Sequence, residues 1–230
     1  MAASRLSRPG WKILGGIAIL VALALAIPRL FGDAEFFRVS KLEVRGLQNM
    51  RAETIVSKLP VRAGQSIFAD LDGIRRAVDS IPGVAGVRVG RRLPGTIVIT
   101  VEETPTVALV MRQGKLQLVS VAGTVLPFDP TVAAPDLPLI READSVLTRF
   151  LDHARDADPT FFGRVVSAWR SGDDVVLTVD KQRYWFRPDA PAEVIRAVMA
   201  VAQDLEKKGR RWAELDARFA GQIVVRREAA

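Results

Sequence analysis

The side chains that most often carry out catalysis or bind metals are scarce in this sequence. His153 is the only histidine, and there is no cysteine, so a His/Cys metal cluster and a cysteine nucleophile are both excluded. No serine lies in a G-x-S-x-G or S-x-x-K setting, and no glycine run resembles a phosphate-binding or dinucleotide-binding loop. We expect His153 to be a solvated helix residue, and we predict no catalytic residue, no metal site, no cofactor and no enzymatic activity.

The acidic residues also lack a spacing that suits acid–base catalysis or calcium binding. Asp70-Leu71-Asp72-Gly73 faintly resembles a calcium loop, but the position that requires a bidentate glutamate holds Ile81. We expect Asp70 to cap a helix instead. Glu102-Glu103 and Asp173-Asp174 are adjacent pairs, and neighbouring side chains in a strand or turn point apart. Neither pair therefore forms a catalytic dyad by itself.

The basic residues do not predict a nucleic-acid surface. The net charge is +7, but four bases precede the first acid, Asp33, and the remaining 29 basic and 26 acidic residues give only +3. The one dense basic cluster, at Arg88, Arg91 and Arg92, has no aromatic residues among it. We expect it to be the solvated tip of a hairpin, and we predict neither a nucleic-acid nor a small-molecule partner.

The first element along the chain is an apolar segment. Residues 13–28 contain no charged side chain. As a helix they extend about 24 Å, which is short of the roughly 30 Å hydrocarbon core of a bilayer. Lys12 and Arg29, which flank the run, can direct their charged ends to the two interfaces. We predict a single transmembrane helix at residues 13–31.

Charges on either side of this segment orient it. Three bases precede the apolar run, and Asp33 and Glu35 follow it, so the positive-inside rule assigns residues 1–12 to the cytoplasm. A cleavable signal peptide is the alternative, because Ala22-Leu23-Ala24 and Ala24-Leu25-Ala26 both have the small-x-small pattern of a cleavage site. Both alternatives deliver the remainder of the chain to the far side of the membrane.

The next block, residues 37–104, is predicted to be a compact unit with the order β-α-α-β-β. Gly46 ends the first strand, Pro60 ends the first helix, and Pro82-Gly83 closes the second helix. The expected elements are a strand in VSKLEVRGL, a helix at Ala52–Leu59, a helix opening at Asp70, and strands at Val84–Val89 and Thr96–Val101.

Residues 105–230 are predicted to form a mostly antiparallel β domain with flanking helices, so the fold class is α+β. The Pro-rich stretch Pro127 to Pro138 is expected to be a loop or an edge crossing. Helices are expected at Asp144–Arg155 and at Ala190–Lys208, the latter with Asp189 as its N-cap. The expected strands are Val107–Met111, Leu116–Val121, Arg164–Trp169, Val175–Val179, Gln182–Phe186, Ala213–Phe219 and Gln222–Arg227.

Several motifs in a fixed order resemble a known family. The predicted anchor is followed by VSKLEVRGL and then by LDGIRRAVDSIPGVAGVRVGRRLPGTIVITVEETPTVAL, and together these resemble the polypeptide-transport-associated (POTRA) domain of the bacterial cell-division proteins FtsQ and DivIB. The stretch Glu214–Phe219, with Gly221 and the run IVVR at residues 223–226, is similar to the closing strands of that family. The resemblance rests on the order and spacing of these motifs, since none of them is diagnostic alone.

The resemblance implies a non-enzymatic, single-pass scaffold of the division machinery. Such a protein lies in the inner (cytoplasmic) membrane with its N-terminus in the cytoplasm. Its POTRA domain follows the membrane, its β domain lies further into the periplasm, and the protein concentrates at the division septum. It recruits later division proteins, notably those of the FtsB and FtsL type.

The resemblance also implies a partner-binding surface near the C-terminus, where a partner segment adds to the sheet. A last strand is often an edge strand, whose free N–H and C=O groups can pair with another chain. The alternative is that Ile223 and Val225 are core residues and Phe219 a packing aromatic. The candidate partner-binding residues are Phe219, Gln222, Ile223, Val224, Val225, Arg226 and Arg227.

A second function to weigh is that of a POTRA-containing periplasmic factor in protein secretion or outer-membrane assembly. Such proteins usually carry several POTRA units and a long series of alternating strands. Residues 105–230 are too short and too often interrupted by helices for that pattern. The division scaffold is therefore the leading hypothesis.

Overall fold

The computed structural model of the protein describes residues 20–22, 37–68, 70–133 and 136–227. The chain divides into two compact units. Unit 1 comprises Met1–Gly46, Ala52–Ile81 and Gly86–Val101, and unit 2 comprises Leu47–Arg51, Pro82–Ala85 and Glu102–Ala230. An α+β fold was predicted, and the helices and sheets in both units confirm it.

The predicted membrane segment at residues 13–31 lies outside the described residues, except for a short helical stretch at residues 20–22. Among the helices of the described part of the chain, none has both the length and the apolar character needed to cross a bilayer.

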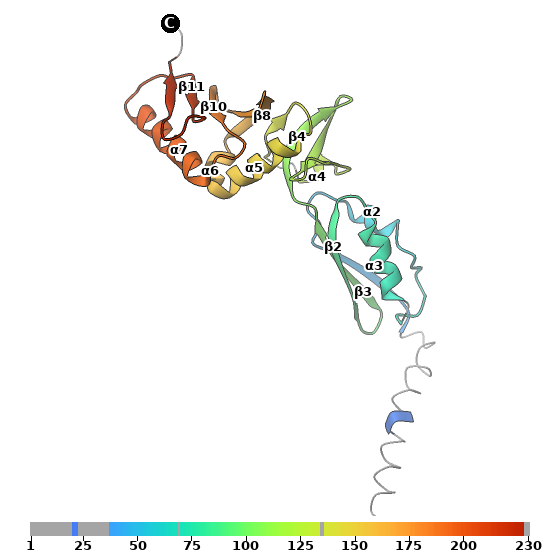
Figure 1. The fold of residues 1–230 in the computed structure, drawn as a ribbon. Helices are drawn as coiled ribbons and strands as arrows, with labels where there is room; N and C mark the ends of the chain where they lie inside the picture. Colours follow the sequence, from blue (N-terminus) through green and yellow to red (C-terminus); the bar gives the residue numbers. More distant parts are fainter. Residues whose placement is uncertain (1–19, 23–36, 69, 134–135, 228–230) are drawn as a thin grey trace, which may run out of the picture. The chain divides into compact units, whose positions relative to one another are not determined.

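Unit 1 contains a small sheet with two helices, in the β-α-α-β-β order that the sequence predicts (Figure 1). The first and third strands pair in parallel, and the sheet order is β1-β3-β2. The elements are β1 (Lys41–Arg45), α2 (Ala52–Val56), α3 (Leu71–Asp79), β2 (Val84–Arg92) and β3 (Thr96–Glu103).

Local sequence signals explain the helix α3 and the strand β3. The Asp70 carboxylate accepts a hydrogen bond from the Asp72 N–H at 2.9 Å, so Asp70 is the N-cap that we predicted. Ile74 and Val78 lie one turn apart on α3 and are fully buried. In β3 the alternate residues Ile97, Ile99 and Val101 are buried, as a strand with one core face requires.

Gly46 follows β1 directly, and this position requires glycine both for its backbone conformation and because there is no room for a side chain. Its φ angle is +83°, which is a conformation that favours glycine. A Cβ atom at this position would lie 2.1 Å from the carbonyl oxygen of Val101. The chain can therefore turn against the end of β3 only because this residue has no side chain.

Unit 2 is built on one large sheet with the strand order β12-β11-β10-β9-β8-β7-β4-β5-β6. The pairings β4–β7, β7–β8 and β10–β11 are parallel, and the other five are antiparallel. The strands are β4 (Thr106–Arg112), β5 (Lys115–Ser120), β6 (Val125–Leu126), β7 (Leu139–Ile140), β8 (Val165–Ser171), β9 (Asp174–Val179), β10 (Gln182–Phe186), β11 (Glu214–Asp216) and β12 (Val224–Arg226).

The helices α5 (Ser145–Ala157), α6 (Pro159–Phe162) and α7 (Ala192–Lys207) pack along one face of this sheet (Figure 1). Both long helices bury the stripes that their 3.6-residue periodicity predicts. The buried stripe residues are Leu147, Phe150, Leu151 and Ala154 on α5, and Ile195, Val198, Met199, Ala202 and Leu205 on α7. One apolar core therefore joins the helices to the strands.

Two sequence expectations for unit 2 need correction, and a third is confirmed. Asp189 does not cap α7: the N-cap is Pro191, and the Asp189 carboxylate accepts a hydrogen bond from Arg187 at 3.2 Å instead. The Pro-rich stretch contains a short helix, α4 (Pro130–Ala133). His153 is solvent-exposed on α5, as predicted.

Candidate partner-binding edge

The strand β12 lies at one edge of the large sheet, paired on one side with β11. It contains three of the seven candidate residues, Val224, Val225 and Arg226. Gln222 and Ile223 precede it in the loop from β11, and Arg227 follows it. The structure thus brings the C-terminal candidates together on one edge strand.

The candidate side chains differ in what they contact. Phe219 is 48% exposed, and Val224 and Val225 are each 38% exposed. Ile223 is partly buried and packs against the core of unit 2. Ile223 is therefore a core-packing residue, as the alternative interpretation of the sequence expected. Phe219 and Val225 instead face solvent.

The backbone of β11 pairs with β10 on one side and with β12 on the other. The Ala217 N–H donates to the Trp185 carbonyl of β10 at 2.9 Å. Consecutive residues of a strand direct their backbone groups to opposite sides. The backbone groups of Leu215 therefore face β10, and those of Glu214 and Asp216 face β12.

This alternation identifies the backbone groups that β12 leaves free. The register pairs Glu214 with Arg226 and Asp216 with Val224, so Arg226 and Val224 direct their backbone groups inward to β11. Val225 lies between them, and its N–H and C=O consequently point away from the sheet. Val225 is the residue of β12 whose backbone an added strand would contact.

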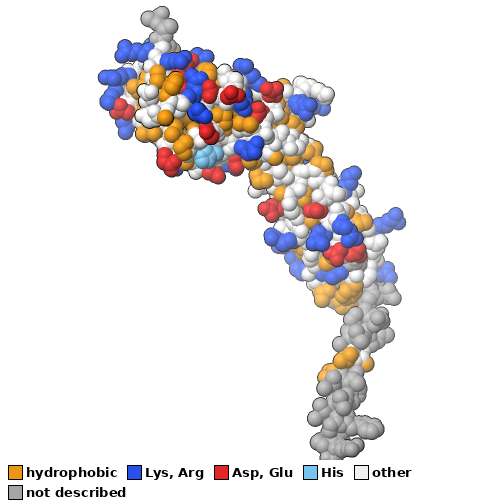
Figure 2. All heavy atoms as spheres, in the orientation of Figure 1, with side chains coloured by type: hydrophobic (Ala, Val, Ile, Leu, Met, Phe, Trp, Pro, Cys, Tyr) orange, Lys and Arg blue, Asp and Glu red, His pale blue; other side chains and the backbone are white. Residues whose placement is uncertain are grey.

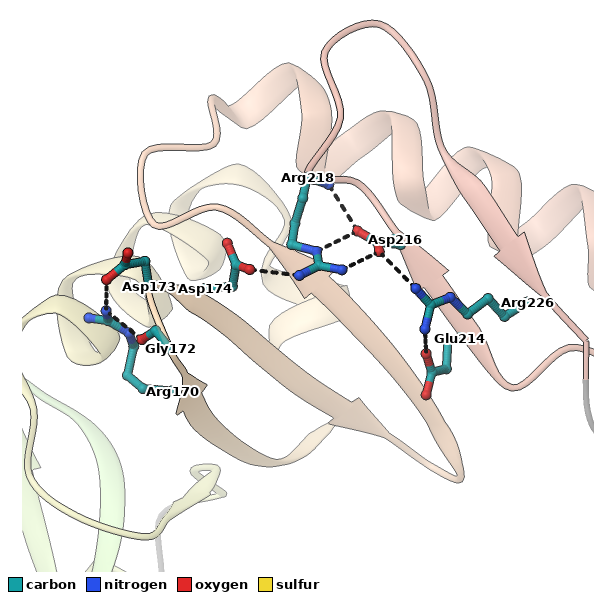
Figure 3. Close-up of polar contacts among 8 residues, drawn as sticks. All are labelled: Arg170, Gly172, Asp173, Asp174, Glu214, Asp216, Arg218 and Arg226. Atoms are coloured by element: carbon teal, nitrogen blue, oxygen red, sulfur yellow. Dashed lines mark hydrogen bonds and ion pairs between the residues drawn. The ribbon is translucent and has the colours of Figure 1, made fainter.

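Side-chain charges reinforce the pairing of β12 with β11. The Arg226 guanidinium lies 3.3 Å from the Glu214 carboxylate and 3.7 Å from the Asp216 carboxylate (Figure 3). Glu214 is buried and also forms an ion pair with Arg183 on β10. Arg226 therefore uses its charge within the fold.

A second arginine completes this network. The Arg218 guanidinium donates to the Asp216 carboxylate at 2.6 and 2.8 Å, and to the Asp174 carboxylate of β9 at 2.7 Å (Figure 3). Asp216 is fully buried, and its hydrogen bonds from Arg218 hold the pKa of this carboxyl below its ordinary value. The same bonds raise the pKa of Arg218. The pair therefore remains ionised at neutral pH.

Arg218 also positions the exposed aromatic side chain beside the edge. Its guanidinium lies 4.6 Å from the centre of the Trp185 ring and 5.9 Å from that of Phe219. Phe219 borders a cavity of about 480 Å³ that is also lined by Pro191 and Val194 at the start of α7. The loop that leads from β11 to β12 thus borders a cavity lined by both apolar and charged residues.

Four residues that hold this edge were not predicted from the sequence: Asp174, Glu214, Asp216 and Arg218. One signal was available, since every second residue from Glu214 to Arg218 is charged, which is typical of a strand with one charged face. Asp174 precedes Arg218 by 44 residues, and only the sheet topology brings these two residues together.

Comparison with known proteins identifies the class of unit 1. The family model described as "POTRA domain, FtsQ-type" matches residues 37–104. This range begins just before β1 and ends just after β3, so it includes all the strands and helices described above for unit 1. The chain therefore contains a POTRA domain of the FtsQ type.

Proteins of similar sequence are named as cell division proteins. The chain is 30% identical over 118 residues to the cell division protein FtsQ of Geotalea daltonii, which covers 50% of this chain and 42% of that protein. It is 31% identical over 115 residues to FtsQ of Novosphingobium aromaticivorans, which covers 50% of this chain and 35% of that protein. The matches thus span less than half of either relative.

A solved structure gives a weaker likeness. The major extracytoplasmic domain of the division protein DivIB from Geobacillus stearothermophilus aligns with a TM-score of 0.34 and 17% identity, over 46% of this chain and 97% of that one. The sequence matches therefore carry the comparison. They confirm the predicted resemblance to the FtsQ/DivIB family, whose members are non-enzymatic division proteins.

Proposed function

We propose that this protein is a non-enzymatic scaffold of the bacterial cell-division machinery. Residues 1–12 form a cytoplasmic tail, residues 13–31 anchor the chain in the inner membrane, and residues 37–104 and 105–230 form a POTRA domain and a β domain in the periplasm. The FtsQ-type POTRA match and the similarity to FtsQ proteins support this proposal.

The observation that carries the proposed binding mode is the difference between the two edges of the large sheet. The β6 edge consists of two residues, its Leu126 is buried, and Pro127 follows it directly. Proline is a device that protects an edge from pairing. The β12 edge exposes both of its valines and directs the N–H and C=O of Val225 outward, so we assign partner binding to β12.

The partner that this edge suits is an extended peptide segment. Added strands gain affinity from main-chain hydrogen bonds and specificity from pockets for alternate side chains. The exposed Phe219 and the adjoining cavity supply such a pocket. We propose that the segment belongs to division proteins of the FtsB and FtsL type, which the scaffold recruits to the septum.

Two experiments test this proposal. Depletion of the protein is expected to give filamentous cells, and a fluorescent fusion is expected to collect at midcell. A tagged chain purified from membranes is expected to bring down the small division proteins, whereas its Val225→Pro variant releases them while remaining folded. Uniform membrane distribution with normal septation would contradict the division role, and unchanged capture by the folded variant would contradict strand addition at β12.

A further inference from the structure

A different surface lies at the end of unit 1 where β1 begins. Lys41 at the start of β1 is paired with Thr96 at the start of β3, so the loop between β2 and β3 lies at this end. A Cβ on Gly95 would lie 2.5 Å from the Arg38 carbonyl oxygen, and the Ser40 N–H donates to the Gly95 carbonyl at 2.9 Å. The hairpin loop is therefore packed directly against the segment that enters unit 1.

A third segment joins this end. The Arg91 side chain donates from Nε to the Ile67 carbonyl at 2.7 Å, and the Ile67 N–H donates to the Phe37 carbonyl at 2.8 Å. The Phe37 and Phe68 rings lie 5.9 Å apart. Three short segments, residues 37–41, 66–68 and 91–95, thus form one continuous surface, which we call the hairpin-end surface.

Apolar side chains project from the hairpin-end surface. Leu93 is 60% exposed and Phe68 is 46% exposed, although both types of residue are usually buried. Figure 2 shows hydrophobic side chains gathered at this end of unit 1 with Lys and Arg side chains close by. Turn loops are usually polar, so an exposed leucine at the loop tip calls for a partner.

Basic residues surround these apolar side chains. Arg38 and Lys41 are exposed, and within the described part of the chain no ion pair engages either of them. Arg92 is balanced by Glu43 at 2.5 Å. The surface therefore combines exposed Leu and Phe with two bases that form no ion pair with a described residue, and this combination is typical of segments that lie in the interface of an anionic membrane.

Chain length restricts what can cover this surface. If residues 13–31 cross the membrane, only five residues lie between Phe31 and Phe37, so the Cα atoms of these two residues are at most about 20 Å apart when the chain is fully extended. The end of unit 1 that contains residue 37 is therefore held close to the bilayer. The anchor keeps the hairpin-end surface near the bilayer at a high effective concentration, so the membrane is the partner that we expect to cover it.

We infer that the hairpin-end surface docks on the membrane: Leu93 and Phe68 insert among the headgroups of the bilayer, while Arg38 and Lys41 attract anionic lipids. This inference rests on the membrane anchor in the proposed function. Docking would give the POTRA domain a fixed orientation on the bilayer. The domain would then orient the rest of the chain and not act only as a spacer.

The absence of cysteine makes a direct test possible. We would introduce Leu93→Cys in the full chain, attach an environment-sensitive fluorophore, and reconstitute the protein in vesicles of phosphatidylethanolamine and phosphatidylglycerol. Val56→Cys is the matched control, because Val56 is an exposed apolar residue of unit 1 on α2, away from the hairpin loop. Lipids with spin-labelled acyl chains are expected to quench the label at 93 several-fold more strongly than the label at 56.

Charge variants separate docking from mere proximity. Arg38→Glu combined with Lys41→Glu is expected to remove most of the quenching at 93, and so are vesicles of phosphatidylcholine alone. Lys58→Glu combined with Arg75→Glu, which changes the charge of unit 1 equally elsewhere, is expected to leave the quenching unchanged.

The possible failures are distinguishable. Release of the chain from the vesicles by alkaline carbonate would overturn both the anchor and the docking inference. Retention of the chain with a label at 93 that is as accessible to water as the label at 56 would overturn the docking inference alone. A label at 93 that is shielded from water but not quenched by lipid would also overturn it, because protein and not lipid would then cover the surface.

Discussion

The edge strand β12 and the hairpin-end surface use their charges and backbone in opposite ways. At β12, the nearby arginines Arg218 and Arg226 are paired with buried carboxylates, whereas no strand among the described residues lies beside the outward backbone groups of Val225. At the hairpin-end surface the backbone of the loop is packed against residues 38–40, whereas the side chains of Arg38 and Lys41 are not engaged in ion pairs with described residues.

This difference indicates two kinds of partner. An unpaired backbone with internally neutralised charge suits another polypeptide, which pairs by main-chain hydrogen bonds and does not depend on long-range attraction. Exposed apolar side chains with uncompensated positive charge suit a lipid surface, which offers no regular hydrogen-bonding pattern. Arg218 and Arg226 therefore support the fold, whereas we expect Arg38 and Lys41 to interact with a partner.

The largest expected effect follows from removing the carboxylate at the centre of the β11 network. Asp216→Ala leaves Arg218 and Arg226 without their shared buried partner. Breaking such a pair from one side typically costs about 3 kcal/mol, and we expect that loss in the free energy of unfolding measured by urea titration. Asp204→Ala, which removes an exposed pair with Lys208 on α7, is the control and should cost less than about 1 kcal/mol. Equal effects of the two variants would refute the structural role of Asp216.

The second prediction concerns the backbone of β12. Val225→Pro removes the outward N–H and places a ring where a partner strand must approach, so we expect partner affinity to fall about thirtyfold, or about 2 kcal/mol. Val225→Ala keeps the N–H and is expected to lose much less affinity. Titration calorimetry with a peptide of the captured partner measures both. Ile223→Pro is less informative, because Ile223 also packs against the core, and loss of binding by that variant would not separate pairing from folding.

Some parts of this site can be predicted from the sequence and others cannot. The position of β12 follows from local signals, since a turn at Ala220-Gly221 is followed directly by the apolar run at residues 223–225. The buried faces of α5 and α7 likewise follow from the sequence, because helical periodicity is a local property. The ion pairs of Asp216 were missed because Asp174 and Arg218 are adjacent only in the folded sheet.

Short elements and competing local bonds limited the remaining predictions. The strand β7 has two residues and therefore no recognisable period, yet it lies inside the sheet between β4 and β8. The four-residue helix α6 was missed for the same reason. Asp189 has the residue type of an N-cap, but the neighbouring Arg187 binds its carboxylate, and sequence rules for capping do not weigh that competition.

A smaller effect is expected from pH. The pKa of Asp216 is lower in the folded protein, chiefly through its hydrogen bonds from Arg218, so the unfolded chain binds more protons at acidic pH. The stability that this carboxylate contributes is complete above the unfolded pKa of about 4 and is lost as the pH falls through the folded value. Asp216→Asn is expected to show a flatter decline of stability below pH 4 than the natural chain, as measured by denaturant titration. An identical slope would mean that other carboxylates account for the acid sensitivity.

The smallest effect on stability is expected at Lys41, and comparing it with Arg218 tests the difference between the two regions directly. Lys41→Gln removes a charge that is not paired within the described residues, so the free energy of unfolding should change by less than about 0.5 kcal/mol. Arg218→Gln removes a side chain similar in size to that of Lys41, but Arg218 bridges two carboxylates. This variant should be clearly destabilised in the same denaturant titration. The two variants change the net charge equally, so net charge cannot explain a difference between them. A loss of stability in Lys41→Gln comparable to that in Arg218→Gln would show that Lys41 supports the fold, and the distinction between structural and interactive bases would then fail.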